Sequence, residues 1–463
     1  MDTIGDNSFV PRGCIGSKVT PPLSGDGFSV GFSDRAVTAW GGLALLKRML
    51  DSLGFREAVE NWDLPTPGSN RGYAPVQLIE QFIVAIWCGA SRFAHAEAVR
   101  FDRPLTRLFN WDRVAGHKAI VRLFERFDML TNERVQAAAY GWIFDRIETL
   151  KRLTLDMDST VLTRYGEQAG ANCGYNPSKP GRASHHPLLA FVSEARLVAN
   201  FWLRPGNAHS ANNVLQFLES TLHHLGNKAV GLLRADSGFF DEAVMTALEG
   251  KNIAYIIAAR LTRPLQRAIW QTSNWWALEK GLELTEIEYR ADGWSRARRI
   301  VVVRQSVRRK EALGKSLSLF ADDPDTQGWR YGAFVTTLDL PPVEVWRSYR
   351  GRADCENRIK ELKADFGLDA FNMRDFFATE AALGFAMLAY NLMSLFRQAV
   401  MRSRVQHTLS TLHGLVLAIG GSWHKDAKQS RLLLSVPRRR RAWFAGLWAN
   451  ATEPSFCLGM ENA

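Results

Sequence analysis

One stretch in the last third of the chain places an acid among cations and a tyrosine at regular intervals. Tyr349, Arg352, Glu356 and Lys363 stand at positions i, i+3, i+7 and i+14, and Lys360 follows the acid by four residues. On a helix of about 3.6 residues per turn these positions form one stripe. The stripe is typical of a solvated, salt-bridged face, because Glu and Lys often pair at i,i+4. The same pattern is compatible with a functional carboxylate, whose neighbouring cations bind a polyanion.

Two further acids change the interpretation of that stripe. Asp158 lies at the end of a predicted strand that starts near Leu153, and Asp236 follows a predicted strand over residues 229–233. Carboxylates at strand ends of an α/β sheet converge on one edge of the fold. We therefore predict that Asp158, Asp236 and Glu356 form one catalytic, metal-binding site.

Three carboxylates supply the oxygen ligands that hard divalent cations require. Such a set could hold two Mg²⁺ ions about 3.5–4 Å apart, with Mn²⁺ as a possible substitute. Two metal ions at this distance bind the attacking and the leaving oxygen of a phosphodiester. The cations Arg352, Lys360 and Lys363 would hold DNA phosphates beside the ions.

Both aspartates have an alternative interpretation. Asp156 precedes Asp158 by two residues and shares its face of the strand, so either carboxylate could reach a metal ion. The Asp-Ser-Thr sequence at Asp158 favours the later residue. Asp236 stands in Asp-Ser-Gly, a sequence typical of a turn as well as of a ligand.

Three motifs carry a resemblance to a known family. The helix has the spacing Tyr-x2-Arg-x3-Glu-x6-Lys without a gap, Asp158 begins Asp-Ser-Thr, and residues 234–239 are Arg-Ala-Asp-Ser-Gly-Phe. In this order they resemble the bacterial insertion-sequence DDE transposases, in the branch defined by that helix motif. The resemblance covers roughly residues 150–400 and includes a β-rich insert between the second Asp and the Glu.

This resemblance implies a ribonuclease-H-like catalytic core and cut-and-paste DNA transposition. It makes the three acids metal ligands, and it makes Tyr349, Arg352 and Lys363 contacts to phosphates at the transposon end. Members of the branch can flip a base near the cleaved end and stack it on an aromatic side chain. Trp294, at a predicted hairpin tip, and Trp329 are the candidates here, although in a chain with 15 tryptophans each could instead be a core or surface residue.

The elements that must position these residues follow from the periodicity of the chain. Apolar residues recur at helical spacing from about 36 to 149, and alternating patterns predict strands between 153 and 338. We predict an α/β fold with a mixed sheet flanked by helices. The predicted regions are a flexible N-terminal segment (1–30), a helical DNA-end-recognition domain (31–150), the ribonuclease-H-like core (151–250 and 343–405), a β-rich insertion (251–342) and a basic C-terminal region (406–463).

Two local predictions concern this organisation. The break at residues 89–91 between two helices could be the turn of a helix-turn-helix or an ordinary turn of a helical bundle. A single long helix is predicted from Pro342 to about Asp365, carrying the stripe described above.

The composition is consistent with a DNA-binding protein. The chain has 463 residues, 46% of them hydrophobic, which excludes a mainly disordered chain, and a formal net charge of +11, which favours a polyanionic partner. The five cysteines form no C-x-x-C pair, so neither a zinc site nor a disulfide scaffold is indicated. There is no signal-peptide pattern, and the most apolar stretch, 385–396, is too short to span a bilayer. We expect a cytoplasmic, nucleoid-associated bacterial protein without a membrane partner.

Together these features predict the transposase of an insertion sequence. It would bind terminal inverted repeats, cut the transposon ends and join their 3′-OH groups to target DNA, as a homodimer in the DNA complex. Residues 296–310 and 438–441 would add contacts to the DNA backbone. One alternative is a ribonuclease-H-like nuclease without strand transfer. Another is an inactive DNA-binding repressor derived from a transposase, although the presence of all three acids and Lys363 argues against such decay.

Overall fold

The structure is a computed structural model that describes residues 23–25, 28–30, 34–68, 72–149, 152–208, 213–306, 328–403, 405–425 and 429–458. Residues 1–22 of the predicted N-terminal segment and residues 307–310 of the predicted basic stretch lie outside the described residues.

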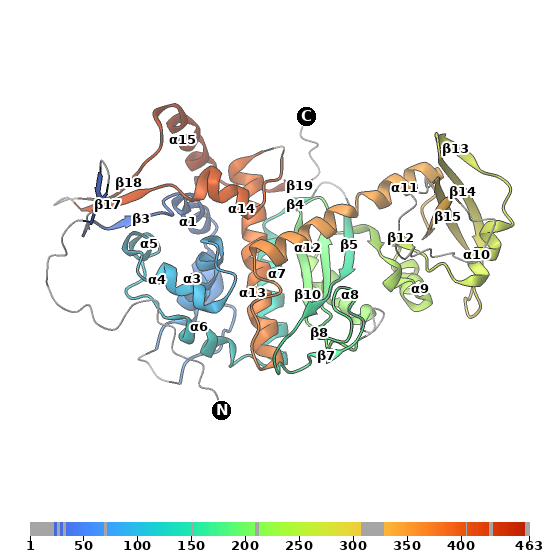
Figure 1. The fold of residues 1–463 in the computed structure, drawn as a ribbon, viewed down its shortest axis with the longest axis horizontal. Coiled ribbons are helices and arrows are strands. Elements are labelled where there is room, and N and C mark those ends of the chain that lie inside the picture. Colours follow the sequence, from blue (N-terminus) through green and yellow to red (C-terminus); the bar gives the residue numbers. More distant parts are fainter. Residues whose placement is uncertain are drawn as a thin grey trace.

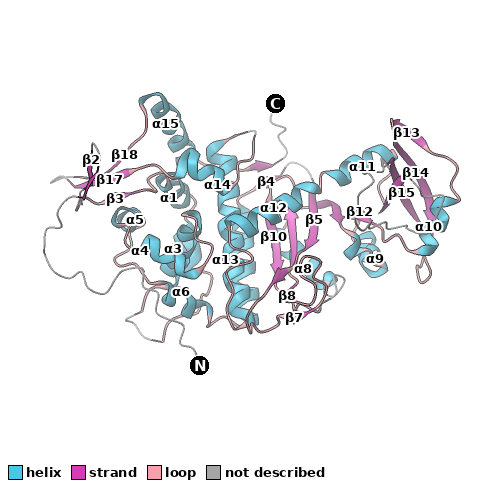
Figure 2. Ribbon diagram, in the orientation of Figure 1, coloured by secondary structure: helices cyan, strands magenta, loops and turns pink. Residues whose placement is uncertain are grey.

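A large mixed sheet is the centre of the molecule (Figures 1 and 2). In the described part of the chain it has nine strands, in the order β10-β9-β5-β11-β12-β16-β15-β14-β13. Their bounds are β5 (Leu153–Ser159), β9 (Leu188–Val192), β10 (Leu197–Trp202), β11 (Val230–Ala235), β12 (Ala254–Ala258), β13 (Trp276–Glu279), β14 (Leu282–Tyr289), β15 (Arg298–Ser306) and β16 (Trp329–Thr336). Strand β11 runs parallel to both β5 and β12, whereas the other pairs in the sheet are antiparallel.

Helices flank this sheet, as the sequence predicted. They are α8 (Val214–Leu225) against β10, α9 (Glu242–Gly250) against β12, α11 (Pro342–Arg350) against β14 and β15, and α13 (Phe376–Leu395) against β10. Helix α12 (Ala353–Asp365) lies over β5 and β9, where Arg358 contacts the ring of Phe191. Because both faces are covered, β5 is buried along most of its length, including its two aspartates. The predicted mixed α/β fold with a helix-flanked sheet is therefore confirmed.

The strands of the predicted insertion are not a separate sheet. Strand β16 pairs with β12 on one side and with β15 on the other, so the β13–β16 part extends the central sheet outward. A second apolar cluster forms between this extension and α11, from Leu282, Leu284, Val301, Val303, Phe334 and Val345. Packing against this cluster holds α11 beside the extension.

The N-terminal helices pack onto α13. They are α1 (Leu43–Ser52), α2 (Phe55–Glu60), α3 (Pro75–Trp87), η1 (Phe93–Ala96), α4 (Glu97–Arg100), α5 (Arg103–Leu108), α6 (His117–Phe124) and α7 (Met129–Asp145). Helix α3 is buried on nearly every side, and its Trp87 donates a hydrogen bond to the Ala389 carbonyl of α13. The break at 89–91 is followed by the short 3₁₀ helix η1 and the four-residue helix α4, which favours an ordinary turn of a helical bundle over a helix-turn-helix.

The C-terminal region returns to these N-terminal helices. Helix α15 (Arg438–Thr452) packs against α1, and strands β17 (Gly421–Lys425) and β18 (Ser430–Leu434) form a small sheet with β3 (Val37–Thr38). The predicted basic run at residues 438–441 forms the first turn of α15. Short helical segments α14 (Leu409–Leu412) and η5 (His413–Leu417) connect α13 to this sheet.

Helix α13 corrects one expectation about length. It continues through a π-helical turn, η4 (Phe396–Met401), and the 26-residue helix Phe376–Met401 is long and apolar enough to span a bilayer by composition. The apolar stretch is therefore longer than the sequence pattern predicted. In this structure 78% of its most apolar window is buried, because it packs against β10 and the N-terminal helices, as a core helix does.

The predicted single helix from 342 to 365 is wrong at one point. Helices α11 and α12 are separated by a turn at Gly351 and Arg352. Both residues keep right-handed helical dihedrals, but the bonds there are i→i+3: Arg352 N–H donates to Tyr349 O (2.9 Å) and Cys355 N–H to Arg352 O (2.8 Å). Such tighter turns occur where a helix is locally constrained. The stripe of site residues therefore straddles a joint.

Candidate functional site

Asp158 occupies the buried end of the site. Its side chain lies on β5, and the residue is 7% exposed. One carboxylate oxygen, Oδ1, accepts the Ser159 N–H (2.8 Å), and the other, Oδ2, lies 2.9 Å from Arg352 Nη2. Burial raises the pKa of Asp158 to about 6, against a lowering by Arg352 and with further increases from Asp236 and Glu356. The two other acids are therefore close enough to act on the charge of Asp158.

Asp236 caps a turn and also faces the site. It follows β11 and caps a short 3₁₀ helix, η2 (Ser237–Phe239), by accepting the Gly238 N–H on Oδ1 (2.9 Å). Both sequence interpretations of Asp236 are therefore compatible, because the cap uses one oxygen. The side chain is half-buried and acts electrostatically on Asp158, Tyr349 and Arg352.

Glu356 lies on the open side. It stands in the first turn of α12 with 61% of its side chain exposed, and its Oε1 is 3.9 Å from Arg352 Nη1. A carboxylate in this turn is favoured by the helix dipole. The structure thus gathers three acids, from a strand, a strand end and a helix, around one guanidinium.

Arg352 is the common partner of these acids. It is 6% exposed, and its Nε has no hydrogen-bond partner among the described residues. Burial lowers the pKa of Arg352, but the neighbouring Asp158 and Tyr349 outweigh burial, so the pKa rises above its ordinary value. The guanidinium is therefore fully charged and compensates the buried carboxylate.

The donor chemistry of the site fits the implied divalent ions. Carboxylate oxygens are the ligands that Mg²⁺ and Mn²⁺ prefer, and Asp236 and Glu356 both retain oxygens that accept no hydrogen bond within the described residues. No group of three His, Cys, Asp or Glu side chains in the described ranges is arranged closely enough to hold one ion as it stands. In this arrangement Arg352 binds the Oδ2 oxygen of Asp158.

Asp156 is distinguished from Asp158 by its partner. It is fully buried, and both of its oxygens receive Arg234: Nε to Oδ1 at 2.6 Å and Nη2 to Oδ2 at 2.8 Å. A carboxylate held by two guanidinium bonds has little capacity left for a metal ion. The structure therefore favours Asp158 as the acid that faces Glu356, and assigns Asp156 to an internal ion pair.

An open pocket adjoins Glu356. Its volume is about 450 Å³, and it is lined by Glu279, Leu282, Gln305, Phe334, Trp346, Tyr349, Arg350, Arg352, Ala353 and Glu356. The ring of Tyr349 packs on Phe334 with centroids 4.4 Å apart, and burial raises the Tyr349 pKa. Sequence reasoning missed Trp346, Phe334 and Gln305. Of these residues, only Trp346 could have been found from the sequence, because it stands three residues before Tyr349 on the same helix.

The two lysines of the stripe have different surroundings. Lys363 is half-buried and its Nζ donates to the Val161 carbonyl (3.1 Å), which ties the end of α12 to the loop after Asp158. Burial lowers the pKa of Lys363. Lys360 is exposed to solvent. Only Lys360 of the two is open to a partner without rearrangement.

Neither predicted stacking tryptophan lines the pocket beside Glu356. Trp294 is 8% exposed, because the hairpin turn folds it onto Phe240 and Tyr289, with ring centroids 5.5 and 5.9 Å away. This placement favours the alternative that Trp294 is a core residue. The ring of Trp329 is covered by Arg304, whose guanidinium carbon lies 4.6 Å from it.

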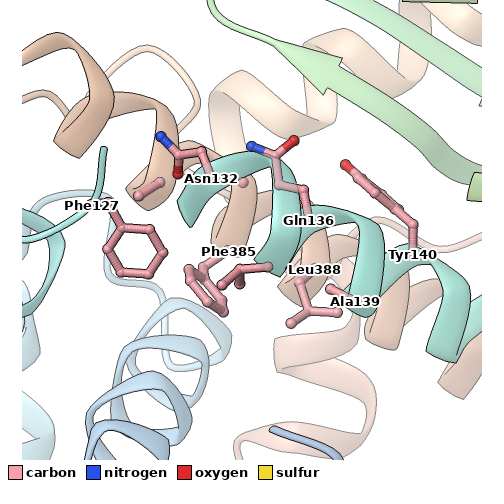
Figure 3. Close-up of a pocket in the computed structure, with 10 residues that line it drawn as sticks. Phe127, Asn132, Gln136, Ala139, Tyr140, Phe385 and Leu388 are labelled. Atoms are coloured by element: carbon pink, nitrogen blue, oxygen red, sulfur yellow. The ribbon is translucent and has the colours of Figure 1, made fainter. Parts of the chain in front are cut away.

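A separate cavity lies between α7 and α13 (Figure 3). It holds about 20 Å³ and is lined mainly by apolar side chains, among them Phe127, Phe385 and Leu388. This space is enough for a water molecule but not for a substrate. None of the predicted site residues lines it. The pocket beside Glu356 is therefore the better candidate for substrate.

Comparison with known proteins defines the family. The chain has no match among curated proteins. A similar solved structure is the cryo-electron microscopy structure of a piggyBac transposase synaptic complex with hairpin DNA, at 11% identity and a TM-score of 0.44, with 83% of this chain and 82% of that chain covered. A family model described as transposase DDE domain group 1 matches residues 21–450. Because that match takes in the helices, the sheet, the acids and the C-terminal region, the chain belongs to the transposase DDE domain group 1 family.

Proposed function

We propose that the chain is the transposase of a bacterial insertion sequence. It cuts DNA at terminal inverted repeats and joins the 3′-OH ends to target DNA. The observation that carries this proposal is the convergence of Asp158, Asp236 and Glu356 around Arg352, on elements far apart in the sequence. Family membership supports a transposase and a polynucleotidyl transferase chemistry.

The proposed catalytic core is ribonuclease-H-like. Its strands are β10-β9-β5-β11-β12, an antiparallel set of three followed by two parallel additions. In this arrangement the carboxyl ends of β5 and β11 deliver Asp158 and Asp236 to the same edge, and α12 delivers Glu356 across it. The order of strands supports the proposal, since the carboxyl ends of parallel strands in α/β sheets commonly form the site.

The three acids would hold the divalent ions, which when bound neutralise phosphate charge and activate the attacking oxygen. Each side chain of the site has a part in binding. Arg352 is placed to exchange Asp158 for a DNA phosphate, and exposed Lys360 and Arg350 extend the positive surface beside it. The half-buried rings of Trp346 and Tyr349 border the same pocket.

We propose that the pocket beside Glu356 receives a base extruded near the cleaved end. Its volume is about 450 Å³, and it combines aromatic walls with the polar Gln305 and Glu279. Stacking on an aromatic ring offsets part of the cost of extruding a base. Trp346 and Tyr349 line this pocket and are therefore better placed for this role than Trp294 and Trp329, which do not line it.

The partners follow from the same chemistry. The +11 net charge supports binding of terminal repeats and target DNA, because neutralised phosphates release counterions. Cutting and joining two ends in one complex implies a homodimer on DNA. A cytoplasmic, nucleoid-associated location is part of this proposal.

The test uses the full chain and DNA from either side of its gene, where inverted repeats should stand. With Mg²⁺, labelled end DNA should be nicked at the repeat boundary and joined to plasmid DNA. D236N and E356Q should abolish both steps. E344Q is the matched control, because Glu344 is also an exposed glutamate that stands in the first turn of its helix and pairs with an arginine. Cleavage without joining would favour a nuclease, and full activity of D236N and E356Q would refute the metal site.

A further inference from the structure

We propose that Arg234 is a positioning residue, which sets the joint between α11 and α12 and thereby the placement of Arg352 and Glu356 over the two aspartates. This inference rests on the proposed function of the acids. Arg234 itself contacts neither Glu356 nor Asp158 directly in the described hydrogen-bond network. It acts through the backbone of α11 and through the two strands that carry the acids.

The Arg234–Asp156 pair lies directly beneath the site. In the parallel pairing of β11 with β5, Arg234 and Asp156 are register partners. Asp158 and Asp236 each follow one member of this pair by two residues, on the same face and about 7 Å further along the chain. The buried pair therefore fixes the relative register of the two segments that end in the acids.

Arg234 also holds the end of α11. Its Nη1 donates to the Ser348 carbonyl (2.6 Å) in the last turn of that helix, while its Nη2 donates to Ser193 Oγ (2.9 Å) as well as to Asp156. A cation at a helix C-terminus is favoured by the helix dipole. Arg358 of α12 in turn donates to the Ser193 carbonyl (3.0 Å). One guanidinium thus joins both strands, the loop after β9 and the helix joint.

Gly351 shows how closely the joint is fitted to Arg234. A Cβ on Gly351 would lie 2.6 Å from Arg234 Nη1 and 3.3 Å from the Ser348 carbonyl oxygen. Gly351 has φ −59°, which any residue accepts, so glycine is not required there for its backbone conformation. It is required for the close approach of the guanidinium.

Stability alone does not account for this network. Replacing a buried ion pair by well-packed apolar side chains often leaves protein stability unchanged or raises it. The contribution of the Arg234–Asp156 pair is therefore the positioning of the segments that it joins. A planar guanidinium can bind a carboxylate with two bonds and still donate sideways to a carbonyl and a hydroxyl, which a lysine cannot. Arg234 makes all of these bonds beside the joint between α11 and α12.

The test compares R234K and G351A with R397K in the full-length protein. R234K keeps the positive charge but removes the planar guanidinium that makes two bonds to Asp156. G351A keeps Arg234 but places a Cβ against its guanidinium. R397K is the matched control, because Arg397 pairs with Glu361 in another buried ion pair (side chains 7% and 5% exposed) away from the joint. We expect kcat for end cleavage to fall about 100-fold in R234K and G351A, with KM for end DNA changed less than about threefold. R397K should lose thermal stability without this split.

Two further readouts separate positioning from a general loss of stability. Mn²⁺ binding to the protein–DNA complex, followed by electron paramagnetic resonance, should weaken in R234K and G351A and stay unchanged in R397K. The double variant R234K/G351A should lose no more kcat than R234K alone, because both changes act through one contact.

Unchanged kcat in a folded R234K or G351A protein, or additive losses in the double variant, would overturn the inference. If R234K does not fold, G351A decides the question, because alanine is compatible with the backbone of Gly351. A wild-type protein that neither cuts nor joins would instead overturn the proposed function, and this inference with it.

Discussion

The guanidinium of Arg352 lies 2.9 Å from the carboxylate of Asp158, and both side chains are less than a tenth exposed. The pair joins the turn at the start of α12 to the end of β5, two segments almost two hundred residues apart in the chain. A divalent ion bound to Asp158 would supply the positive charge that Arg352 now provides, and it would repel that guanidinium. Metal binding and release of Arg352 to a DNA phosphate are therefore expected to occur together.

Removal of Arg352 should destabilise the protein. R352Q leaves Asp158 buried without its counter-ion, a change that typically costs about 3–5 kcal/mol near neutral pH. Urea unfolding should show this loss, and millimolar Mn²⁺ should restore part of it by supplying the missing positive charge. R350Q serves as the control, because Arg350 is exposed and contacts the ring of Trp346. An R352Q protein as stable as wild type would contradict the ion-pair role.

The pH dependence follows from the raised pKa of Asp158. Burial raises this pKa to about 6, above that of the unfolded chain, so protonated Asp158 stabilises the folded state at low pH. This contribution is lost as pH rises towards 6, and the stability of wild type relative to D158N should fall over that range. Because metal ligands must be deprotonated, the single-turnover cleavage rate at a Mg²⁺ concentration below saturation should rise with pH up to about 6 and then level off. A rate independent of pH between 5 and 7 at that Mg²⁺ concentration would contradict the role of Asp158 as a ligand.

Local patterns in the sequence predicted much of this site. The spacing of Tyr349, Arg352 and Glu356 placed these residues on one stripe, and the alternation in residues 153–158 placed Asp158 at a strand end. The alternation of the strand could not separate Asp156 from Asp158, because both lie on one face, and only the Asp-Ser-Thr sequence favoured Asp158. The distinction comes from Arg234, which only the pairing of β5 with β11 brings to Asp156.

The other differences between the sequence-based predictions and the structure also arise from tertiary contacts. The sequence left open whether Trp294 is a stacking residue or a core residue, because the contact of the hairpin tip with Phe240 comes from a different part of the chain. The joint at Gly351 was missed, because its helical dihedrals and the residues around it are compatible with one continuous helix. The pocket beside Glu356 combines α11 with strands of the insertion, a contact that no sequence period encodes.

The aromatic wall of that pocket gives a prediction about the substrate. W346A should reduce the end-cleavage rate about 10- to 100-fold, because stacking of one base on an aromatic ring contributes about 1–3 kcal/mol. The fluorescence of 2-aminopurine placed next to the cleavage site should be quenched by wild type and much less by W346A. W294A should lose stability, since it removes a buried ring, and keep the quenching in whatever fraction remains folded. Equal quenching by W346A and wild type would remove Trp346 from the stacking role.

Lys360 and Lys363 should differ, although the same contact with DNA phosphates was predicted for both from the sequence. K360Q removes an exposed charge, so it should leave the melting temperature unchanged. If Lys360 contacts a phosphate, the slope of log Kd for end DNA against log salt should also fall by about 0.9. K363Q removes a half-buried ammonium that donates to the Val161 carbonyl, so it should lower the melting temperature and loosen the loop after Asp158. Filter binding at several salt concentrations and thermal melts of the two variants measure these effects side by side. A change of salt slope in K363Q with no loss of stability would show that Lys363 leaves Val161 to bind DNA.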